Sequence, residues 1–140
     1  KKENVHEWFD LAGMEESPHM MYAVEALEGV ADKIPSVIHV DNTCRVQTVT
    51  VEQNEHYYNL IDSFEKLSGV PILFNTSFNL GGEPLVESIE DAIETLETSD
   101  IKYMYLPEIQ KLITIDYKND SDKIFQYRSS FLKDDDHVEI

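Results

Sequence analysis

Basic residues are scarce in this chain of 140 residues, where 28 aspartates and glutamates stand against 11 lysines and arginines and the formal net charge is −17. Binding to DNA or RNA depends on Lys and Arg side chains that replace the counterions of the phosphates. We therefore expect no nucleic-acid partner. A small phosphate ligand is still compatible with this charge, because a local site with several donors and Mg²⁺ can offset the surrounding acids.

Cysteine and long apolar runs are equally rare. Cys44 is the single cysteine, which excludes an internal disulfide and a cysteine-rich zinc site. No second histidine stands at ligand spacing from His39, so we expect no bound transition metal. No apolar run approaches the ~20 residues that span a bilayer, and Lys1 and Lys2 are followed at once by Glu3 rather than by an apolar segment typical of a secretory signal. These features predict a cytoplasmic protein with no membrane partner.

Length and hydrophobic content, 41% of the residues, are typical of one domain with a buried core. We expect residues 1–117 to form this domain and residues 118–140 to be a polar C-terminal extension, frayed around Asp134, Asp135 and Asp136. Periodicity predicts helices at 4–11, 54–67 and 88–96, and strands at 20–27, 36–40, 44–51, 70–74, 102–106 and 112–117. The order predicts an α/β (α+β) fold with a twisted mixed sheet and packed helices.

The two longer predicted helices carry clear end signals. Asn54 is the expected N-cap of the first, and Gly69 stands just past its end. Ser88 and Asp91 predict a capping box for the second. Helical spacing leads us to interpret one stripe of the first helix as core packing and not as a nucleotide-binding box. The stripe comprises Tyr57, Tyr58, Ile61 and Phe64.

One motif occupies residues 70–86, VPILFNTSFNLGGEPLV, in which an apolar run breaks into small hydrogen-bonding residues and glycines. A buried strand that ends in such residues directs amides, hydroxyls and bare backbone at one place. A small polar or anionic ligand would suit that place. The alternative is an ordinary polar turn between a strand and a helix.

A second motif occupies residues 38–50, IHVDNTCRVQTVT, and alternates in the manner of a strand. It contains Arg45, one of only two arginines in the chain, the other being Arg128. An arginine in this acidic chain can serve a structural ion pair with one of the acids. Alternatively, its guanidinium can bind a phosphate or carboxylate with two parallel hydrogen bonds, which lysine cannot do.

Together the two motifs resemble the C-terminal domain of the O-carbamoyltransferase family, which includes nodulation-factor, cephalosporin and aminoglycoside carbamoyltransferases. The resemblance runs from about residue 8 to residue 115. It implies a YrdC/Sua5-like fold, present here as an incomplete domain, that belongs to a longer enzyme with an N-terminal glycoprotease-like domain. It also implies that this domain takes carbamoyl phosphate and ATP with Mg²⁺ and forms carbamoyl adenylate, from which the N-terminal domain carbamoylates an acceptor hydroxyl.

The resemblance also assigns roles to residues. Arg45 is the expected catalytic residue, because it would stabilise charge on the transferring group. The expected carbamoyl phosphate and ATP ligands are Arg45, Thr43, Asn75, Ser77 and Asn79. Residues that would hold Mg²⁺ or support the site are Asp41, Glu83 and His39. Turn capping is the alternative for Asn75, Ser77 and Asn79, an ion pair for Glu83, and a structural role for His39.

Two departures from the family pattern bear on activity. Gly81 stands where many members carry a basic residue, and Asp41-Asn42 replaces a more usual Asp-Gly. We expect that this chain, as a piece of a longer enzyme, does not turn over alone. One alternative is a non-catalytic binding domain that keeps the fold. Another is a related enzyme such as a threonylcarbamoyl-AMP synthase, against which the lack of basic charge counts. The sequence indicates neither the acceptor nor the oligomeric state.

Overall fold

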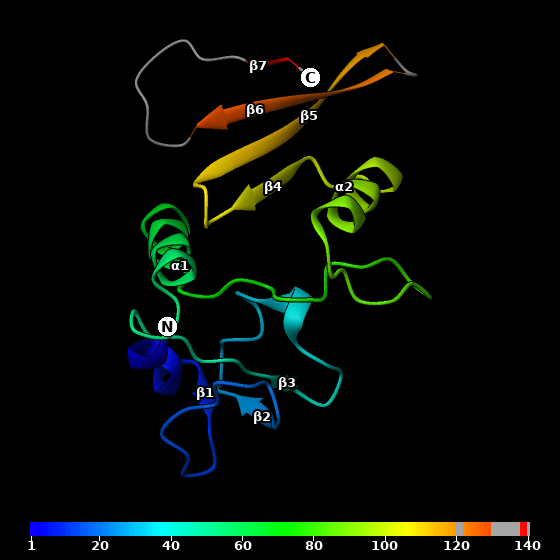
Figure 1. The fold of residues 1–140 in the computed structure, drawn as a ribbon. Coiled ribbons are helices and arrows are strands. Elements are labelled where there is room, and N and C mark those ends of the chain that lie inside the picture. The colour runs from blue at the N-terminus through cyan, green and yellow to red at the C-terminus, as the bar shows by residue number, and fades with distance from the viewer. Residues whose placement is uncertain (120–121, 130–137, 140) are drawn as a thin grey trace. The chain divides into compact units, whose positions relative to one another are not determined.

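The computed structural model describes residues 1–119, 122–129 and 138–139, with side chains described through residue 115 (Figure 1). Its contacts divide the chain into two compact units, Lys1–Asn75 and Thr76–Ile140.

The first unit is a small antiparallel sheet with helical segments. The sheet has the order β1-β2-β3, with Phe9 opposite Ala26 and Val24 opposite Cys44. Its elements are η1 (Lys2–Glu7), β1 (Phe9–Asp10), β2 (Ala23–Ala26), η2 (Pro35–Val37), β3 (Thr43–Arg45) and α1 (Glu55–Ser68). A core of apolar residues from the strands and their loops holds the unit together. It comprises Val5, Trp8, Phe9, Leu11, Val24, Ala26, Val30, Ile34, Cys44 and Val46.

Helix α1 begins and ends where the sequence predicts. The Asn54 side chain accepts a hydrogen bond from the Tyr57 amide at 2.9 Å, and Gly69 ends the helix with φ +74°. Of the predicted core stripe, Ile61 is buried and Tyr57 and Tyr58 are half-buried, whereas the prediction is wrong for Phe64, which is 39% exposed. The core cluster of this unit is formed by the sheet and its loops, and none of its residues comes from α1.

The second unit packs one helix and a four-stranded antiparallel sheet around its own core. The sheet has the order β4-β5-β6-β7. The elements are α2 (Ile89–Thr98), β4 (Tyr103–Leu106), β5 (Lys111–Asn119), β6 (Asp122–Ser129) and β7 (Val138–Glu139). The core residues are Ala92, Leu96, Met104, Ile113 and Ile115. The predicted capping box of α2 is confirmed, since Ser88 accepts from the Asp91 amide and Asp91 accepts from the Ser88 amide.

The α+β class is confirmed, although the described strands form two antiparallel sheets rather than one mixed sheet. The helix expected at 4–11 is the shorter η1 followed by β1. The strand expected at 36–40 is wrong, because Pro35 at the first position sets the φ of a short 3-10 turn. The strand expected at 70–74 is also wrong, since Pro71 lacks an amide donor and Phe74 is 70% exposed.

Beyond residue 117 the sequence predicts no strand, whereas β5 runs to Asn119 and β6 follows it. The predicted frayed stretch at Asp134–Asp136 lies outside the described residues. Among the described residues, no helix has the length and apolar character needed to cross a bilayer.

Candidate functional site

Arg45 ends β3 on the exposed side of the first sheet. The strand pairs Arg45 with Ala23 of β2, and burial alternates along it so that Cys44 and Val46 lie inside while Arg45 and Gln47 lie outside. Side chains two residues apart in extended chain share a face, so Arg45 and Gln47 face the same way. Among the described side chains, none makes a hydrogen bond or ion pair with the Arg45 guanidinium. The alternative role of Arg45, a structural ion pair, therefore has no carboxylate partner among the described side chains.

A tight turn leads into β3. One carboxylate oxygen of Asp41 accepts hydrogen bonds from the Thr43 hydroxyl at 2.7 Å and the Thr43 amide at 3.1 Å, and these bonds hold the pKa of Asp41 below its usual value. Asn42 adopts φ +65° and donates from its side chain to the Ala26 carbonyl at 2.9 Å, as its tolerance of left-handed backbone predicts. The Thr43 carbonyl accepts from the amide of exposed His39 at 2.8 Å. Asp41 and Thr43 thus shape the approach to Arg45, with one Asp41 oxygen already engaged.

Asn75 lies against the segment that carries Arg45. Its side-chain amide donates to Gln47 Oε1 at 2.7 Å and reaches Met20 Sδ at 3.7 Å. The Gln47 amide in turn donates to the Pro18 carbonyl at 3.0 Å. These contacts join one residue of each sequence motif, Gln47 and Asn75. Gln47 was not predicted as a site residue, although its spacing of two from Arg45 was a signal for it.

Ser77, Asn79 and Glu83 belong to the second unit, so their convergence with Arg45 stays a prediction. Asn79 donates from its side chain to the Glu83 carbonyl at 2.8 Å, and the Glu83 carboxylate accepts from the Leu80 amide at 3.1 Å. This is the turn-capping arrangement that was the alternative for Asn79. Its side-chain oxygen Oδ1 is buried, with no hydrogen-bond partner among the described residues. Ser77 is exposed.

The two glycines of this loop differ. Gly82 has φ +90°, a backbone conformation that favours glycine. Gly81 has no such constraint, and a Cβ placed there would meet no atom within 4 Å. The local backbone therefore leaves room for a Cβ atom at position 81.

A polar pocket opens beside the Gln47–Asn75 contact. It encloses ≈ 480 Å³ and is lined by Pro18, His19, Gln47, Thr48, Val49, Gln53, Asn54, Tyr57 and Asn75. Tyr57 is half-buried, and that burial raises the pKa of its hydroxyl. Of these lining residues, only Asn75 is among the predicted site residues. The others come from segments that meet only in the folded chain.

The wall of this pocket is held in place by buried hydrogen bonds. The Ser17 amide donates to the Thr48 hydroxyl at 2.9 Å, and the Thr48 amide donates back to the Ser17 carbonyl at 2.9 Å. The Ser17 hydroxyl donates to the Val46 carbonyl at 2.8 Å. The chain that carries Pro18 and His19 is thereby fixed to the segment after β3.

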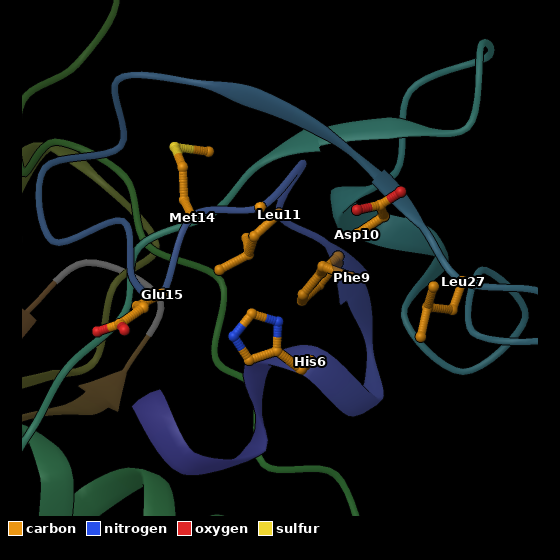
Figure 2. Close-up of a pocket in the computed structure, with 8 residues that line it drawn as sticks. His6, Phe9, Asp10, Leu11, Met14, Glu15 and Leu27 are labelled. Atoms are coloured by element: carbon orange, nitrogen blue, oxygen red, sulfur yellow. The ribbon is translucent and has the colours of Figure 1, made fainter.

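A second pocket of ≈ 350 Å³ is lined by residues of η1, β1 and nearby loops. None of the predicted site residues lines it. Figure 2 shows His6, Phe9 and Leu11 gathered around it, with Met14 and Glu15 nearby. Asp10 at its edge accepts a hydrogen bond from the Ala12 amide at 2.8 Å. Among the described residues, no three His, Cys, Asp or Glu side chains are grouped so as to hold a metal ion.

Comparison with known proteins identifies the family. The family described as Carbamoyltransferase C-terminus matches residues 1–111. The chain is 42% identical over 101 residues to nodulation protein NolNO of Sinorhizobium fredii and 40% identical over 101 residues to nodulation protein NolO of Bradyrhizobium diazoefficiens. These matches cover 71% of this chain but only 15% and 18% of the relatives.

A third relative, nodulation protein U of Rhizobium tropici, is 38% identical over 65 residues, which is 46% of this chain and 11% of that protein. The chain thus spans less than a fifth of the length of these relatives. With the family match extending over most of its residues, the chain belongs to the carbamoyltransferase C-terminal domain family.

Proposed function

We propose that this chain is the nucleotide- and carbamoyl-phosphate-binding part of an O-carbamoyltransferase. In the whole enzyme, carbamoyl phosphate would lose its phosphate to water and leave carbamate, whose oxygen would displace pyrophosphate from Mg²⁺-bound ATP to give carbamoyl adenylate. The carbamoyl group would then pass to a hydroxyl of an acceptor on an N-terminal glycoprotease-like domain, with release of AMP. The observation that carries the proposal is the shared face of Arg45 and Gln47, with Asn75 hydrogen-bonded to Gln47. Family membership supports the choice of reaction.

Arg45 is the residue best suited to a phosphate in this part of the chain. Its guanidinium is exposed and makes no contact with a carboxylate among the described side chains. The chain has 28 acidic residues. An exposed arginine that contacts none of the described carboxylates retains its hydrogen-bond donors for an oxyanion. A bidentate contact of that kind is stronger and more directional than a lysine contact. During adenylation the same group would stabilise charge that develops on the phosphoryl oxygens.

The neighbouring residues take supporting roles in this proposal. Asn75 would donate to an oxygen of the ligand or hold Gln47 in position, and Ser77 and Asn79 would complete the site from the following loop. Asp41 and Glu83 each have one carboxylate oxygen engaged in their own turns. Either would therefore contact Mg²⁺·ATP through its other oxygen or through water.

The proposal is tested by titrating the chain with Mg²⁺·ATP and with carbamoyl phosphate. NMR chemical shifts monitor the binding. We expect both ligands to shift resonances of Arg45, Gln47 and Asn75. Arg45→Ala should weaken both by ~10- to 100-fold, the range expected for a charge-assisted contact. The control is Lys66→Ala, which removes the same charge from α1, where Lys66 pairs with Asp62 at 2.6 Å.

The outcomes separate the candidate functions. A loss in Arg45→Ala without a loss in Lys66→Ala supports the proposal. If neither ligand binds, the result would instead favour a non-catalytic domain that keeps the fold. Pyrophosphate release by the isolated chain, dependent on ATP and carbamoyl phosphate, would contradict the expectation that this piece does not turn over alone.

A further inference from the structure

The second pocket, which residues of η1, β1 and nearby loops line, has an apolar floor (Figure 2). Phe9 and Leu11 are 5% and 1% exposed and belong to the core of the first unit, and Met14 packs against that core. Leu27, which is 37% exposed, adds an aliphatic side chain from the loop after β2. The pocket encloses ≈ 350 Å³, a volume within the range of pockets that hold small organic ligands. Its floor therefore suits a ligand with an apolar body.

Backbone hydrogen bonds fix the segments that form this floor. The Leu27 amide donates to the Trp8 carbonyl at 2.9 Å, which ties the loop after β2 to the start of β1. The Met14 amide donates to the Leu11 carbonyl at 3.1 Å and closes the turn after β1. These bonds join backbone atoms of the protein, so the floor does not depend on a ligand for its shape. A preformed pocket of this kind lowers the ordering cost of binding.

The polar side chains that line the pocket are an imidazole and two carboxylates. They belong to His6, Asp10 and Glu15, and no lining residue is Lys or Arg. One Asp10 oxygen accepts from the Ala12 amide at 2.8 Å, which leaves the second oxygen as an acceptor. Asp10 also stands opposite Glu25 in the β1-β2 ladder, and like charges directly opposite destabilise a sheet. Pairing of the two strands therefore gives no reason for a carboxylate at position 10.

Protein cations do not neutralise this rim. The hydrogen bond to Glu16 and the charges of Glu16 and Glu15 raise the pKa of Lys2, but its ammonium pairs with Glu16, at 2.9 Å. Among the described side chains, no cation makes an ion pair with Asp10 or Glu15. In a chain of net charge −17, the two carboxylates attract a cation and repel an anion. Neither substrate of the proposed function suits this field, since carbamoyl phosphate and ATP are both anionic.

We propose that this pocket binds a small organic cation, an amine or guanidine carried on an apolar body. The body would pack on Leu11 and Met14, and the N–H groups of the head would donate to the carboxylates at the rim. The inference does not depend on the proposed function. The pocket lies at β1 and Arg45 lies on β3, which are the two edge strands of the first sheet.

Three probes that share a phenyl body and differ in the head group test the inference at pH 7. They are 2-phenylethylamine, which is cationic, 2-phenylethanol, which is neutral, and 3-phenylpropanoate, which is anionic. In an NMR titration of the wild-type chain, the amine should shift the resonances of Leu11, Met14 and Glu15. The alcohol should bind about three- to tenfold more weakly, the range expected for loss of two exposed charge contacts, and the carboxylate more weakly still.

A double variant, Asp10→Asn with Glu15→Gln, removes both charges and keeps the size of the side chains. The asparagine oxygen can still accept from the Ala12 amide. This variant should bind the amine about three- to tenfold more weakly and the alcohol as the wild type does. The matched control is Asp32→Asn with Glu55→Gln, which makes the same two changes at exposed residues of the same unit that do not line the pocket. Its amine affinity should be unchanged.

Three results would overturn the inference. They are an amine that shifts no residue of the pocket, an amine that binds no better than the alcohol or the carboxylate, and equal amine affinity in the two double variants. The amide spectrum of each variant reports whether it is folded, and the comparison of the three probes on the wild type requires no variant. Arg45→Ala should leave the amine affinity unchanged, so loss of ATP binding with amine binding retained would overturn the proposed function alone.

Discussion

The buried hydrogen bonds between Ser17 and Thr48 offer a sharp test of how the pocket wall is held. Both residues are only 2% exposed, and the Thr48 hydroxyl accepts the Ser17 amide at 2.9 Å. Thr48→Val keeps the shape of the side chain and removes this acceptor. The Ser17 amide would then be buried without its partner, a loss that costs about 1–3 kcal/mol. We expect the free energy of unfolding to fall by that amount.

The assay is urea denaturation followed by the fluorescence of Trp8, the single tryptophan, which is buried in the core of the first unit. Its signal reports the unit that contains Thr48, so unfolding of the second unit does not obscure the measurement. Thr50→Val is the matched control, because the Thr50 hydroxyl accepts an exposed 3.3 Å contact from the Gln53 amide and otherwise hydrogen-bonds the exposed Glu52 carboxylate. It should cost less than ~0.5 kcal/mol. Equal losses in the two variants would refute the reasoning.

Two further predictions concern the second unit. Leu96 is fully buried, so Leu96→Ala should lower the free energy of unfolding of this unit by ~2–5 kcal/mol. The measurement is hydrogen exchange of the α2 amides, which should become faster. Unchanged exchange would show that the core is not built around Leu96. Hydrogen bonds from Ser88 hold the pKa of Asp91 below its ordinary 3.8, so the charged cap stabilises α2 above pH 3.8 and is lost as the pH falls through the lower folded pKa. Ser88→Ala should raise the pKa of Asp91 toward 3.8 in an NMR titration of the carboxyl, and an unmoved pKa would contradict the contribution of the Ser88 side chain.

Helix α1 and helix α2 were predictable because their ends are encoded locally. Asn54 and Ser88 cap backbone amides three residues away, and Gly69 supplies the positive φ that ends α1. These interactions depend on residues close in sequence. The apolar face of α1 was misjudged for the same reason, because periodicity shows which face is apolar and not whether the fold covers it.

The strands depended on partners that the sequence does not reveal. The run at 70–74 is apolar enough for a buried strand, yet it lacks one amide at Pro71 and forms no ladder. Conversely, β6 pairs with β5 from Lys111 opposite Ser129 through Asn119 opposite Asp122, although its residues read as a polar tail. Pairing supplies the backbone hydrogen bonds that a strand requires, and composition alone did not show where pairing occurs.

Of the candidate site, local pattern predicted Arg45 and the turn at Asp41-Asn42, whereas the Gln47–Asn75 contact joins residues 28 apart. That separation explains why the pocket lined by both was not predicted.

The strongest argument for a ligand is that Arg45 is exposed and forms no ion pair with the described side chains. An exposed ion pair stabilises a fold by at most about 1 kcal/mol, so a chain gains little from pairing an exposed arginine and loses little by leaving it unpaired. Yet the ion pairs of Lys1, Lys2 and Lys66 with Asp62, Glu65 and Glu16 use lysines, and none of them uses Arg45. The one arginine of the first unit instead presents its donors on the face shared with Gln47. Fold stability gives no reason for a guanidinium there, whereas an oxyanion such as phosphate, which accepts two parallel hydrogen bonds from arginine, does.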